Sequence, residues 1–211
     1  MFDASLKAAQ DERSDLVRLR ALYDGLLAAT PAEISDGARV DLDAMARIFD
    51  LDAGRPPAEV WRDLRAVLTR QAAPAQTEAE TEGPIPTTPP LTIMVVEDDP
   101  GMAADLTDLL IEAGHGVVGP FPEPGAATAA AGLHALDLAL VDINLIGEGD
   151  GVALAQVLKD SWGVPVMFLS GDVAAAARHA RLATALVLKP YGRRDVLAAI
   201  ARAVDSGAVA A

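Results

Sequence analysis

The chain has no cysteine and few aromatic residues. Its 211 residues are 51% hydrophobic, but only 4% are Phe, Trp or Tyr. The absence of thiols excludes disulfides, thiolate metal sites and cysteine nucleophiles. With so few rings, the core has to be built from Ala, Leu and Val, which suits layered helices and an aliphatic sheet.

Histidine and long apolar runs are also scarce. His115, His134 and His179 lack the spacing of metal ligands, and we expect them in loops or on helix surfaces. No apolar run approaches the roughly 20 residues that a membrane-spanning helix needs. The N-terminus also lacks a basic stretch followed by an apolar one. We therefore expect a cytoplasmic protein without a membrane partner.

Positive charge is in deficit along the whole chain. Lys and Arg number 17 against 31 Asp and Glu, which gives a formal net charge of -14. A protein of this balance has no large basic face for the phosphates of a nucleic acid. The sequence therefore disfavours a general nucleic-acid-binding protein.

Residues 1–73 are predicted to form a small all-α domain. Leucines at helical spacing predict one long amphipathic helix first. Thr30 to Glu33 has the form of a capping box for a short second helix, which Ser35-Asp36-Gly37 interrupts. A further helix, with Asp41 as its cap, and another after Pro57 complete the predicted bundle.

Residues 74–90 are rich in Pro and Glu and poor in apolar bulk. Such a segment cannot bury enough apolar surface to fold, and it predicts a semi-extended linker. The chain is therefore expected to consist of a helical domain (1–73), this linker (74–90) and a second domain (91–211).

Beyond the linker, short apolar runs alternate with helical patterns. Strands are expected at 91–96, 116–119, 138–141, 164–169 and 185–188, and helices at 100–113, 124–133, 152–161, 173–181 and 193–204. Short runs bounded by turn residues are typical of buried parallel strands. This alternation predicts an α/β domain with a doubly wound parallel sheet and helices on both faces.

Polar residues follow four of these predicted strands. Glu97, Asp98 and Asp99 follow the first strand, Asp142 ends the third, Ser170 the fourth and Lys189 the fifth. Because ligands bind at the carboxyl ends of parallel strands, these groups are expected to share one pocket.

Clustered carboxylates repel unless a hard cation joins them, and oxygen ligands of this kind suit Mg²⁺. With Mg²⁺ on Asp98 and Asp142, an oxygen of Asp142 could attack a phosphoryl group whose charge Lys189 helps to neutralise. Ser170 would then donate a hydrogen bond to the attached group. The backbone carbonyl of Asn144 is a candidate further ligand, and the glycines at 147–151 let the backbone approach. Asp99 suits an N-cap for the next helix better than a metal ligand.

Four fragments in this order resemble the receiver domain of two-component response regulators. They are Val-Val-Glu-Asp-Asp-Pro at 95–100, Val-Asp-Ile-Asn-Leu at 141–145 with Asp-Gly at 150–151, Leu-Ser-Gly at 169–171 and Lys-Pro at 189–190. The resemblance covers just over half of the chain.

The resemblance implies a flavodoxin-like (βα)5 fold and a signalling protein that is not an enzyme. It implies Asp142 as the phosphoacceptor of a histidine kinase or phosphotransfer protein. It further implies Glu97 and Asp98 as the acidic pair that binds Mg²⁺, Ser170 as the switch hydroxyl and Lys189 as the lysine that is invariant in receiver domains. Whether the protein forms a homodimer is left open.

Two features depart from the family pattern. Many receivers carry an aromatic residue three positions before the lysine, whereas this chain has Leu186, and Tyr191 does not occupy that position. Receivers also commonly precede their output domain, whereas this one follows it. How phosphorylation is transmitted is therefore open.

Haloacid-dehalogenase-type phosphatases offer a rival interpretation, because they also combine an aspartate nucleophile with a hydroxyl, a lysine and Mg²⁺. Their paired aspartates lie on the first strand, and a second Asp serves as general acid. Here the acidic pair comes first, and the residue two beyond Asp142 is Asn144. The order of the motifs therefore disfavours a phosphatase.

The output of residues 1–73 has two candidate forms. One is an interaction module whose protein contacts change on phosphorylation. The other is a helix-turn-helix that presents Arg55, Arg62, Arg65 and Arg70 to DNA. The connection at 50–57 is long for that motif and the region is acidic, so we favour the interaction module. The segment contains no histidine and so cannot be a phosphohistidine relay.

Overall fold

The computed structural model describes residues 17–25, 34–49, 51–71, 88–145 and 150–209. The chain divides into two compact units. One consists of residues 1–82 together with 172–181, and the other of residues 83–171 together with 182–211. None of the helices in the described ranges is long and apolar enough to cross a membrane.

The second unit is built on a sheet of five parallel strands, which confirms the predicted fold class. Its strands are β1 (Thr92–Val96), β2 (Gly116–Phe121), β3 (Leu138–Asp142), β4 (Val166–Ser170) and β5 (Ala183–Leu188). The order β2-β1-β3-β4-β5 is that of the flavodoxin-like fold. In this order β1 and β3 are neighbours although β2 lies between them in the chain, so their carboxyl ends meet.

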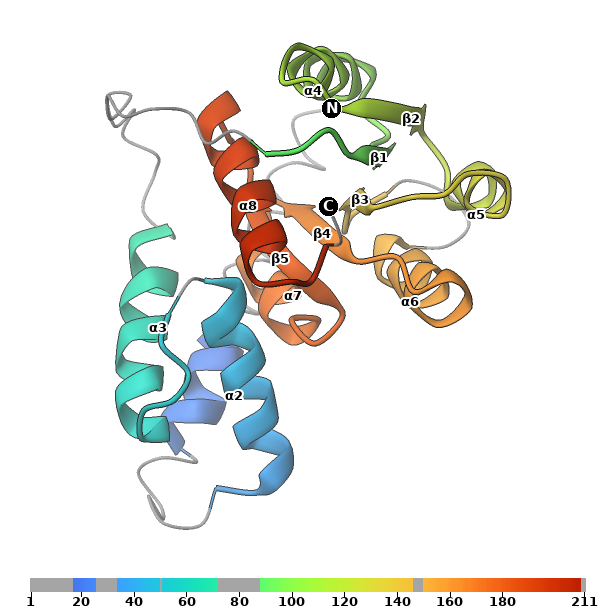
Figure 1. The fold of residues 1–211 in the computed structure, drawn as a ribbon. Helices are drawn as coiled ribbons and strands as arrows, with labels where there is room; N and C mark the ends of the chain where they lie inside the picture. The colour runs from blue at the N-terminus through green and yellow to red at the C-terminus, as the bar shows by residue number, and fades with distance from the viewer. Residues whose placement is uncertain (1–16, 26–33, 50, 72–87, 146–149, 210–211) are drawn as a thin grey trace, which may run out of the picture. The chain divides into compact units, whose positions relative to one another are not determined.

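Helices cover both faces of this sheet. They are α4 (Pro100–Glu112), α5 (Pro124–Ala131), α6 (Gly151–Trp162) and α8 (Arg193–Asp205), and α7 (Val173–Arg178) connects β4 to β5. Figure 1 shows α4 and α8 on one face of the sheet and α5 and α6 on the other. Both faces are therefore buried, as the continuously apolar strands predict.

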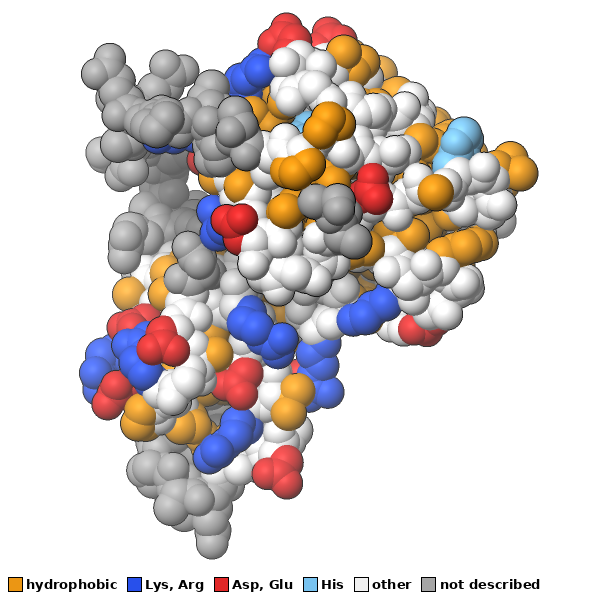
Figure 2. Space-filling model, viewed as in Figure 1, with side chains coloured by type: hydrophobic (Ala, Val, Ile, Leu, Met, Phe, Trp, Pro, Cys, Tyr) orange, Lys and Arg blue, Asp and Glu red, His pale blue; other side chains and the backbone are white. Residues whose placement is uncertain are grey.

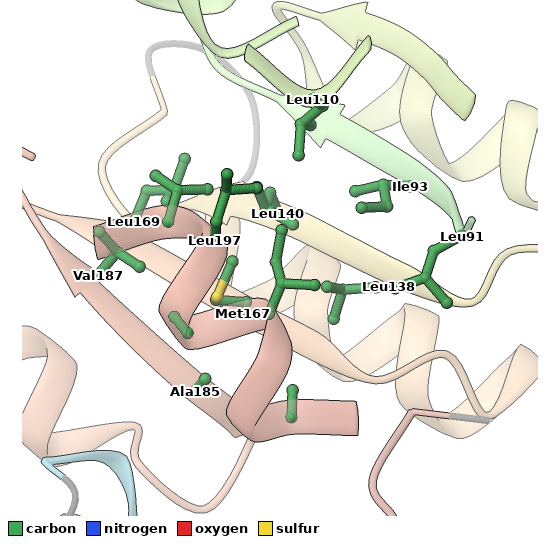
Figure 3. Close-up of a cluster of buried hydrophobic side chains, with 14 of the residues drawn as sticks. Leu91, Ile93, Leu110, Leu138, Leu140, Met167, Leu169, Ala185, Val187 and Leu197 are labelled. Atoms are coloured by element: carbon green, nitrogen blue, oxygen red, sulfur yellow. The ribbon is translucent and has the colours of Figure 1, made fainter. Parts of the chain in front are cut away.

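The core between the sheet, α4 and α8 is aliphatic. Every second strand residue points into it, because successive side chains of a strand face opposite sides. Figure 3 shows this cluster, which includes Leu91, Ile93, Leu110, Leu138, Leu140, Met167, Leu169, Ala185, Val187 and Leu197. Among the described residues, its buried members include no aromatic ring, in keeping with the composition.

Aspartate caps start three of the helices that follow strands. Asp99, Asp150 and Asp172 accept hydrogen bonds from the backbone N–H three residues on, at 2.8, 2.6 and 2.9 Å. Such caps satisfy amides that the first turn of a helix leaves unpaired. The prediction that Asp99 is an N-cap is thus confirmed.

Besides α7, the described helices of the first unit are residues 17–25, α2 (Asp36–Ile48) and α3 (Pro57–Gln71). Tyr23 stacks on Trp61 with ring centroids 4.9 Å apart, and the Trp61 indole donates to Asp24 Oδ1 at 2.8 Å. Buried Leu42, Met45 and Leu64 add the aliphatic part of this small core. The predicted helical segment before the sheet is therefore present.

The predicted start of the third helix was wrong. Ser35 is the N-cap of α2 and accepts from Ala38 N at 3.3 Å, so Ser35-Asp36-Gly37 begins a helix instead of interrupting one. Asp41 lies inside α2, where its carboxylate pairs with Arg181 Nε at 2.6 Å. A serine hydroxyl and an aspartate are equally good caps, and the sequence alone did not distinguish them.

Several predictions lie outside the described residues. They concern the capping box at 30–33, both ends of the first helix, most of the linker (74–87) and the glycines at 147 and 149. The domain boundaries at 73 and 91 therefore stay a prediction.

Candidate functional site

The acidic residues that follow β1 and β3 come together at the carboxyl end of the sheet. Val96 pairs with Val141, so the next residues, Glu97 and Asp142, lie side by side. Both are buried, with relative exposures of 2% and 5%. Carboxylates buried this deeply need a partner of opposite charge.

Lys189 supplies that charge from the end of β5. Its Nζ lies 2.6 Å from Asp142 Oδ2 and 2.7 Å from Glu97 Oε2. Burial alone would lower the pKa of Lys189, but the bonds to Asp142 and Glu97 outweigh burial, and the pKa lies above its ordinary value. Lys189 is therefore a fixed positive charge between the two carboxylates. Burial also raises the pKa of Glu97, with Lys189 acting in the opposite direction.

Three carboxylates could hold a metal ion here. Oxygen atoms of Glu97, Asp98 and Asp142 all lie within 4.8 Å of one another. Asp98 is partly exposed, whereas the other two are buried and contact Lys189. Hard oxygen donors in such a cluster fit Mg²⁺, so the predicted ligand set is chemically suitable.

The second oxygen of Asp142 is held by backbone. Asp142 Oδ1 accepts from Asn144 N at 3.0 Å, and Asn144 is exposed. This contact is made by the backbone N–H of Asn144. The prediction that its backbone carbonyl is a metal ligand stays untested. The two oxygens of Asp142 therefore have different partners, an ammonium and an amide.

Gly151 allows the chain to pass directly over Asp142. Its N–H donates to Ile143 O at 3.2 Å, and a Cβ added to it would lie 1.9 Å from the Asp142 carbonyl oxygen. Any side chain would collide with the backbone that carries the acidic group. This packing explains the Gly at the start of α6.

Ser170 closes the site from β4. It is fully buried, and its carbonyl accepts from Lys189 N at 2.8 Å. The bond ties the backbone that carries Lys189 to the neighbouring strand. The five predicted site residues on strand ends, which are Glu97, Asp98, Asp142, Ser170 and Lys189, are thus all at the same end of the sheet.

A hollow of about 400 Å³ lies beside Glu97 and Asp98. Its walls are mostly apolar and come from α4 and from the segment around β2. They include Pro100, Ala103, Ala104, Thr107, Pro120 and Pro122. The acidic cluster thus borders a surface that could receive an apolar side chain of another molecule.

Two buried polar groups did not follow from the sequence, one of His115 at the amino end of the sheet and one of Tyr191 beyond Lys189. His115 lies in the loop before β2, in agreement with the prediction of a loop or helix surface, but it is buried, with 5% relative exposure, and its Nδ1 accepts from Leu91 N at 3.3 Å. Tyr191 has a buried hydroxyl with no hydrogen-bond partner in the described part of the chain. Neither residue lies in a motif, and only tertiary packing reveals its role.

Comparisons with known proteins agree with this geometry. A family model described as the response regulator receiver domain matches residues 93–201. The transcriptional regulatory protein PdtaR of Mycobacterium tuberculosis is 29% identical over 120 residues, which cover 55% of this chain and 58% of PdtaR. The chain thus matches little more than half the length of this relative.

Solved structures resemble the same region. The signal receiver domain of a modulated diguanylate cyclase from Desulfovibrio desulfuricans G20 is 30% identical, with a TM-score of 0.52, and the match covers 56% of this chain and 95% of that one.

One similar structure extends over both helical segment and sheet. A double mutant of the anti-anti-sigma factor PhyR from Bartonella quintana is 23% identical, with a TM-score of 0.54, and the match covers 90% of this chain and 69% of that one. This likeness concerns the fold alone. Because the family model matches more than half of its residues, the chain belongs to the response regulator receiver family.

Proposed function

We propose that the protein accepts a phosphoryl group on Asp142 and uses it to switch protein contacts of its helical segment, residues 1–73. The observation that carries the proposal is Lys189 Nζ, which bridges Asp142 Oδ2 and Glu97 Oε2 at 2.6 and 2.7 Å. An aspartate held between an ammonium and further carboxylates is suited to phosphoryl transfer, which depends on positioning and charge neutralisation.

The proposed donor is the phosphohistidine of a histidine kinase or phosphotransfer protein. A lone pair of the Asp142 carboxylate forms the new P–O bond while the P–N bond breaks. The electrons of that bond return to the imidazole nitrogen, which takes a proton from water. Lys189 neutralises charge on the phosphoryl oxygens, and the Ser170 hydroxyl donates to one of them. The chain carries out no other catalysis in this proposal.

Mg²⁺ is the proposed cofactor. Glu97, Asp98, Asp142 and the Asn144 carbonyl would hold it, and the cation would neutralise phosphoryl charge in the way Lys189 does. The acid-rich donor set supports this choice, because three carboxylates within 4.8 Å of one another outnumber the one lysine charge beside them. A further positive charge therefore stabilises the site.

The hollow beside Asp98 supports a protein donor. Its apolar wall lies next to the acidic cluster, so a side chain seated there would place its neighbours close to Asp142. A partner that buries this wall would also exclude water from the reacting groups.

For the output, we propose that α7 carries the signal. This helix follows Ser170 in the chain, and residues 172–181 belong to the same compact unit as α2. Arg181 pairs with Asp41 Oδ1 at 2.6 Å and donates to Gly37 O at 2.9 Å. A movement of Ser170 toward a phosphoryl group would thus act on contacts made by the helical segment.

The charge pattern of the helices favours a protein partner over DNA. Arg55 pairs with Asp63 at 2.7 Å, and Arg65 pairs with Asp24 at 3.2 Å. Figure 2 shows acidic and basic side chains interspersed over the described helices on the face it draws. The connection at 49–56 also exceeds the 3 to 4 residues of a helix-turn-helix. The DNA-binding alternative is therefore disfavoured by its turn and by the acids that engage Arg55 and Arg65.

An anti-sigma factor is a candidate partner class. The structure of PhyR, which is named an anti-anti-sigma factor, matches 90% of this chain, including its helices. A pull-down with an anti-sigma factor encoded in the same genome, with and without a phosphoryl donor, tests this idea. No phosphorylation-dependent binding would remove that class.

The experiment for the phosphoacceptor is intact-mass measurement after incubation with acetyl phosphate and Mg²⁺. We expect one added phosphoryl group on the wild type and none on Asp142→Ala. Asp160→Ala is the control, because Asp160 is an exposed carboxylate that hydrogen-bonds Gln156 on α6. Equal labelling of wild type and Asp142→Ala would refute the assignment.

A further inference from the structure

Tyr191 carries a buried polar atom that no described residue satisfies. Its hydroxyl is shielded from solvent and has no hydrogen-bond partner among the described residues. Buried hydroxyls are nearly always paired, because an unpaired one loses its bonds to water without replacement. A phenylalanine would fill the same space without this cost, so the hydroxyl calls for an explanation.

The charges of the acidic site act on this hydroxyl. Tyr191 lies two residues after Lys189 and packs against the aliphatic core between the sheet, α4 and α8. The pKa of Tyr191 is raised to about 12, chiefly by burial; the charge of Glu97 and, more weakly, that of Asp142 act in the same direction, whereas Lys189 acts against them. Among these charges Glu97 acts most strongly, so the hydroxyl is within electrostatic reach of that carboxylate.

Glu97 depends on Lys189 for its ion pair, and phosphorylation competes for that lysine. Lys189 Nζ contacts both Glu97 and Asp142. A phosphoryl group on Asp142 would bring new anionic oxygens to the same ammonium. Glu97, at 2% exposure, would then need another donor.

We propose that Tyr191 is a positioning residue, whose hydroxyl donates a hydrogen bond to Glu97 when a phosphoryl group on Asp142 draws Lys189 away. This inference rests on the proposed phosphoacceptor function. Without a phosphoryl group on Asp142 the hydroxyl stays unpaired, which disfavours that state. With the phosphoryl group the hydroxyl bonds Glu97, which favours the phosphorylated state, so Tyr191 shifts the equilibrium toward it.

Tyr191 would also link the site to α8, which Leu186 on β5 cannot do. Leu186 pairs with Phe168 in the sheet and carries no polar atom or ring that could respond to a phosphoryl group. Tyr191 lies on the connection between β5 and α8, so its rearrangement would reach the first turn of α8. The response would then travel by a tyrosine beyond the lysine.

Tyr191→Phe tests the inference, because it removes only the oxygen. The probe is beryllium fluoride with saturating Mg²⁺, a phosphoryl mimic that binds without covalent chemistry, and the readout is its dissociation constant by calorimetry. We expect the constant to rise roughly 2- to 10-fold, the range that one hydrogen bond spans. Without the mimic, the variant should melt no lower than the wild type.

Tyr23→Phe is the matched control. Tyr23 is the other tyrosine of the chain and lies in the compact unit that does not contain the acidic site. It should leave the dissociation constant of beryllium fluoride unchanged.

Two results would overturn the inference while the phosphoacceptor function stands. One is an unchanged dissociation constant in Tyr191→Phe, and the other is a lower melting temperature of that variant without the mimic, which would mean that the hydroxyl is already paired. If the wild type binds no beryllium fluoride and takes no label from acetyl phosphate, the phosphoacceptor function fails and this inference fails with it.

Discussion

At the scale of single residues, the site separates charges that look alike in the sequence. Glu97, Asp98 and Asp99 are consecutive acids, yet the first contacts Lys189, the second joins the cluster of carboxylates that could hold a metal ion and the third caps α4. Strand β1 ends at Val96, and the side chains of the three residues that follow it lie in different surroundings. Neighbouring carboxylates thus have distinct roles that substitutions can separate.

The first prediction concerns Asp98 and Asp99. Asp98→Asn should weaken Mg²⁺ binding at least about tenfold, because it removes one anionic ligand of a hard cation. Asp99→Ala should leave Mg²⁺ affinity nearly unchanged but lower the free energy of unfolding by about 1 kcal/mol, the usual value of a lost N-cap. Calorimetric titration and urea unfolding measure the two effects. Mg²⁺ affinity lost in Asp99→Ala but kept in Asp98→Asn would contradict the roles assigned to these two residues.

The second prediction concerns Gly151. Gly151→Ala places a Cβ 1.9 Å from the Asp142 carbonyl oxygen, so the backbone under the acidic group must move. We expect a loss of about 1–3 kcal/mol in the free energy of unfolding and a loss of labelling by acetyl phosphate.

Gly125→Ala is the control for that variant. Gly125 lies in α5 with nothing within 4 Å of an added Cβ, so alanine should stabilise the protein by about 0.5–1 kcal/mol. If both variants unfold alike, the close contact at Gly151 does not constrain the site.

At the scale of elements, the sequence predicted the sheet well and the helix starts less well. All five strands overlap their predicted ranges, because short apolar runs between turn residues are distinctive. The residues of the site were predictable for the same reason: strand ends place them together whatever the loops do. The start of α2 at Asp36 was missed, because Ser35 and Asp41 offer equivalent caps and only tertiary contacts choose between them.

His115 shows what the sequence could not reveal. It begins the segment before β2, and its ring accepts from Leu91 N while its Nε2 lies 3.4 Å from Thr88 Oγ1. The residue therefore fixes the chain just after the linker to the sheet. A lone histidine carries no pattern, so this role depends on packing that no periodicity predicts.

The third prediction follows from that contact. Burial lowers the pKa of His115 below its ordinary value of 6.5, so the folded protein favours the neutral ring that accepts from Leu91. The stabilisation is complete above pH 6.5 and is lost as the pH falls through the lower pKa of the folded state. Urea unfolding at about pH 7.5 and about pH 5.5, on either side of the ordinary pKa of histidine, should show this loss.

His115→Asn provides the comparison, because the asparagine oxygen can accept the same bond without titrating. The variant should lose less stability between the two pH values than the wild type does. Identical losses in both proteins would show that His115 does not contribute to the pH dependence.

At the scale of the whole molecule, a receiver-type sheet follows a helical segment, and α7 belongs to the compact unit of the helices although it connects two strands of the sheet. A segment shared in this way couples the two units through the chain itself. A change at Ser170, which precedes α7, would therefore be expected to reach the helices.

The fourth prediction is that phosphorylation changes the dimer fraction or the contact between the units. Small-angle scattering and sedimentation velocity with beryllium fluoride and Mg²⁺ should differ from the same measurements without the mimic. Asp142→Ala should show no difference between the two conditions. Identical profiles for wild type in both conditions would count against a switch of protein contacts.

The central claim is that Asp142 carries the phosphoryl group, and chemical mapping tests it most directly. Borohydride reduces an acyl phosphate of aspartate to homoserine, so the wild type treated with acetyl phosphate, Mg²⁺ and then borohydride should contain homoserine at position 142. Peptide mass spectrometry reads the position. Reduction at another aspartate or glutamate, or unaltered Asp142 in protein that has gained a phosphoryl group, would contradict the account.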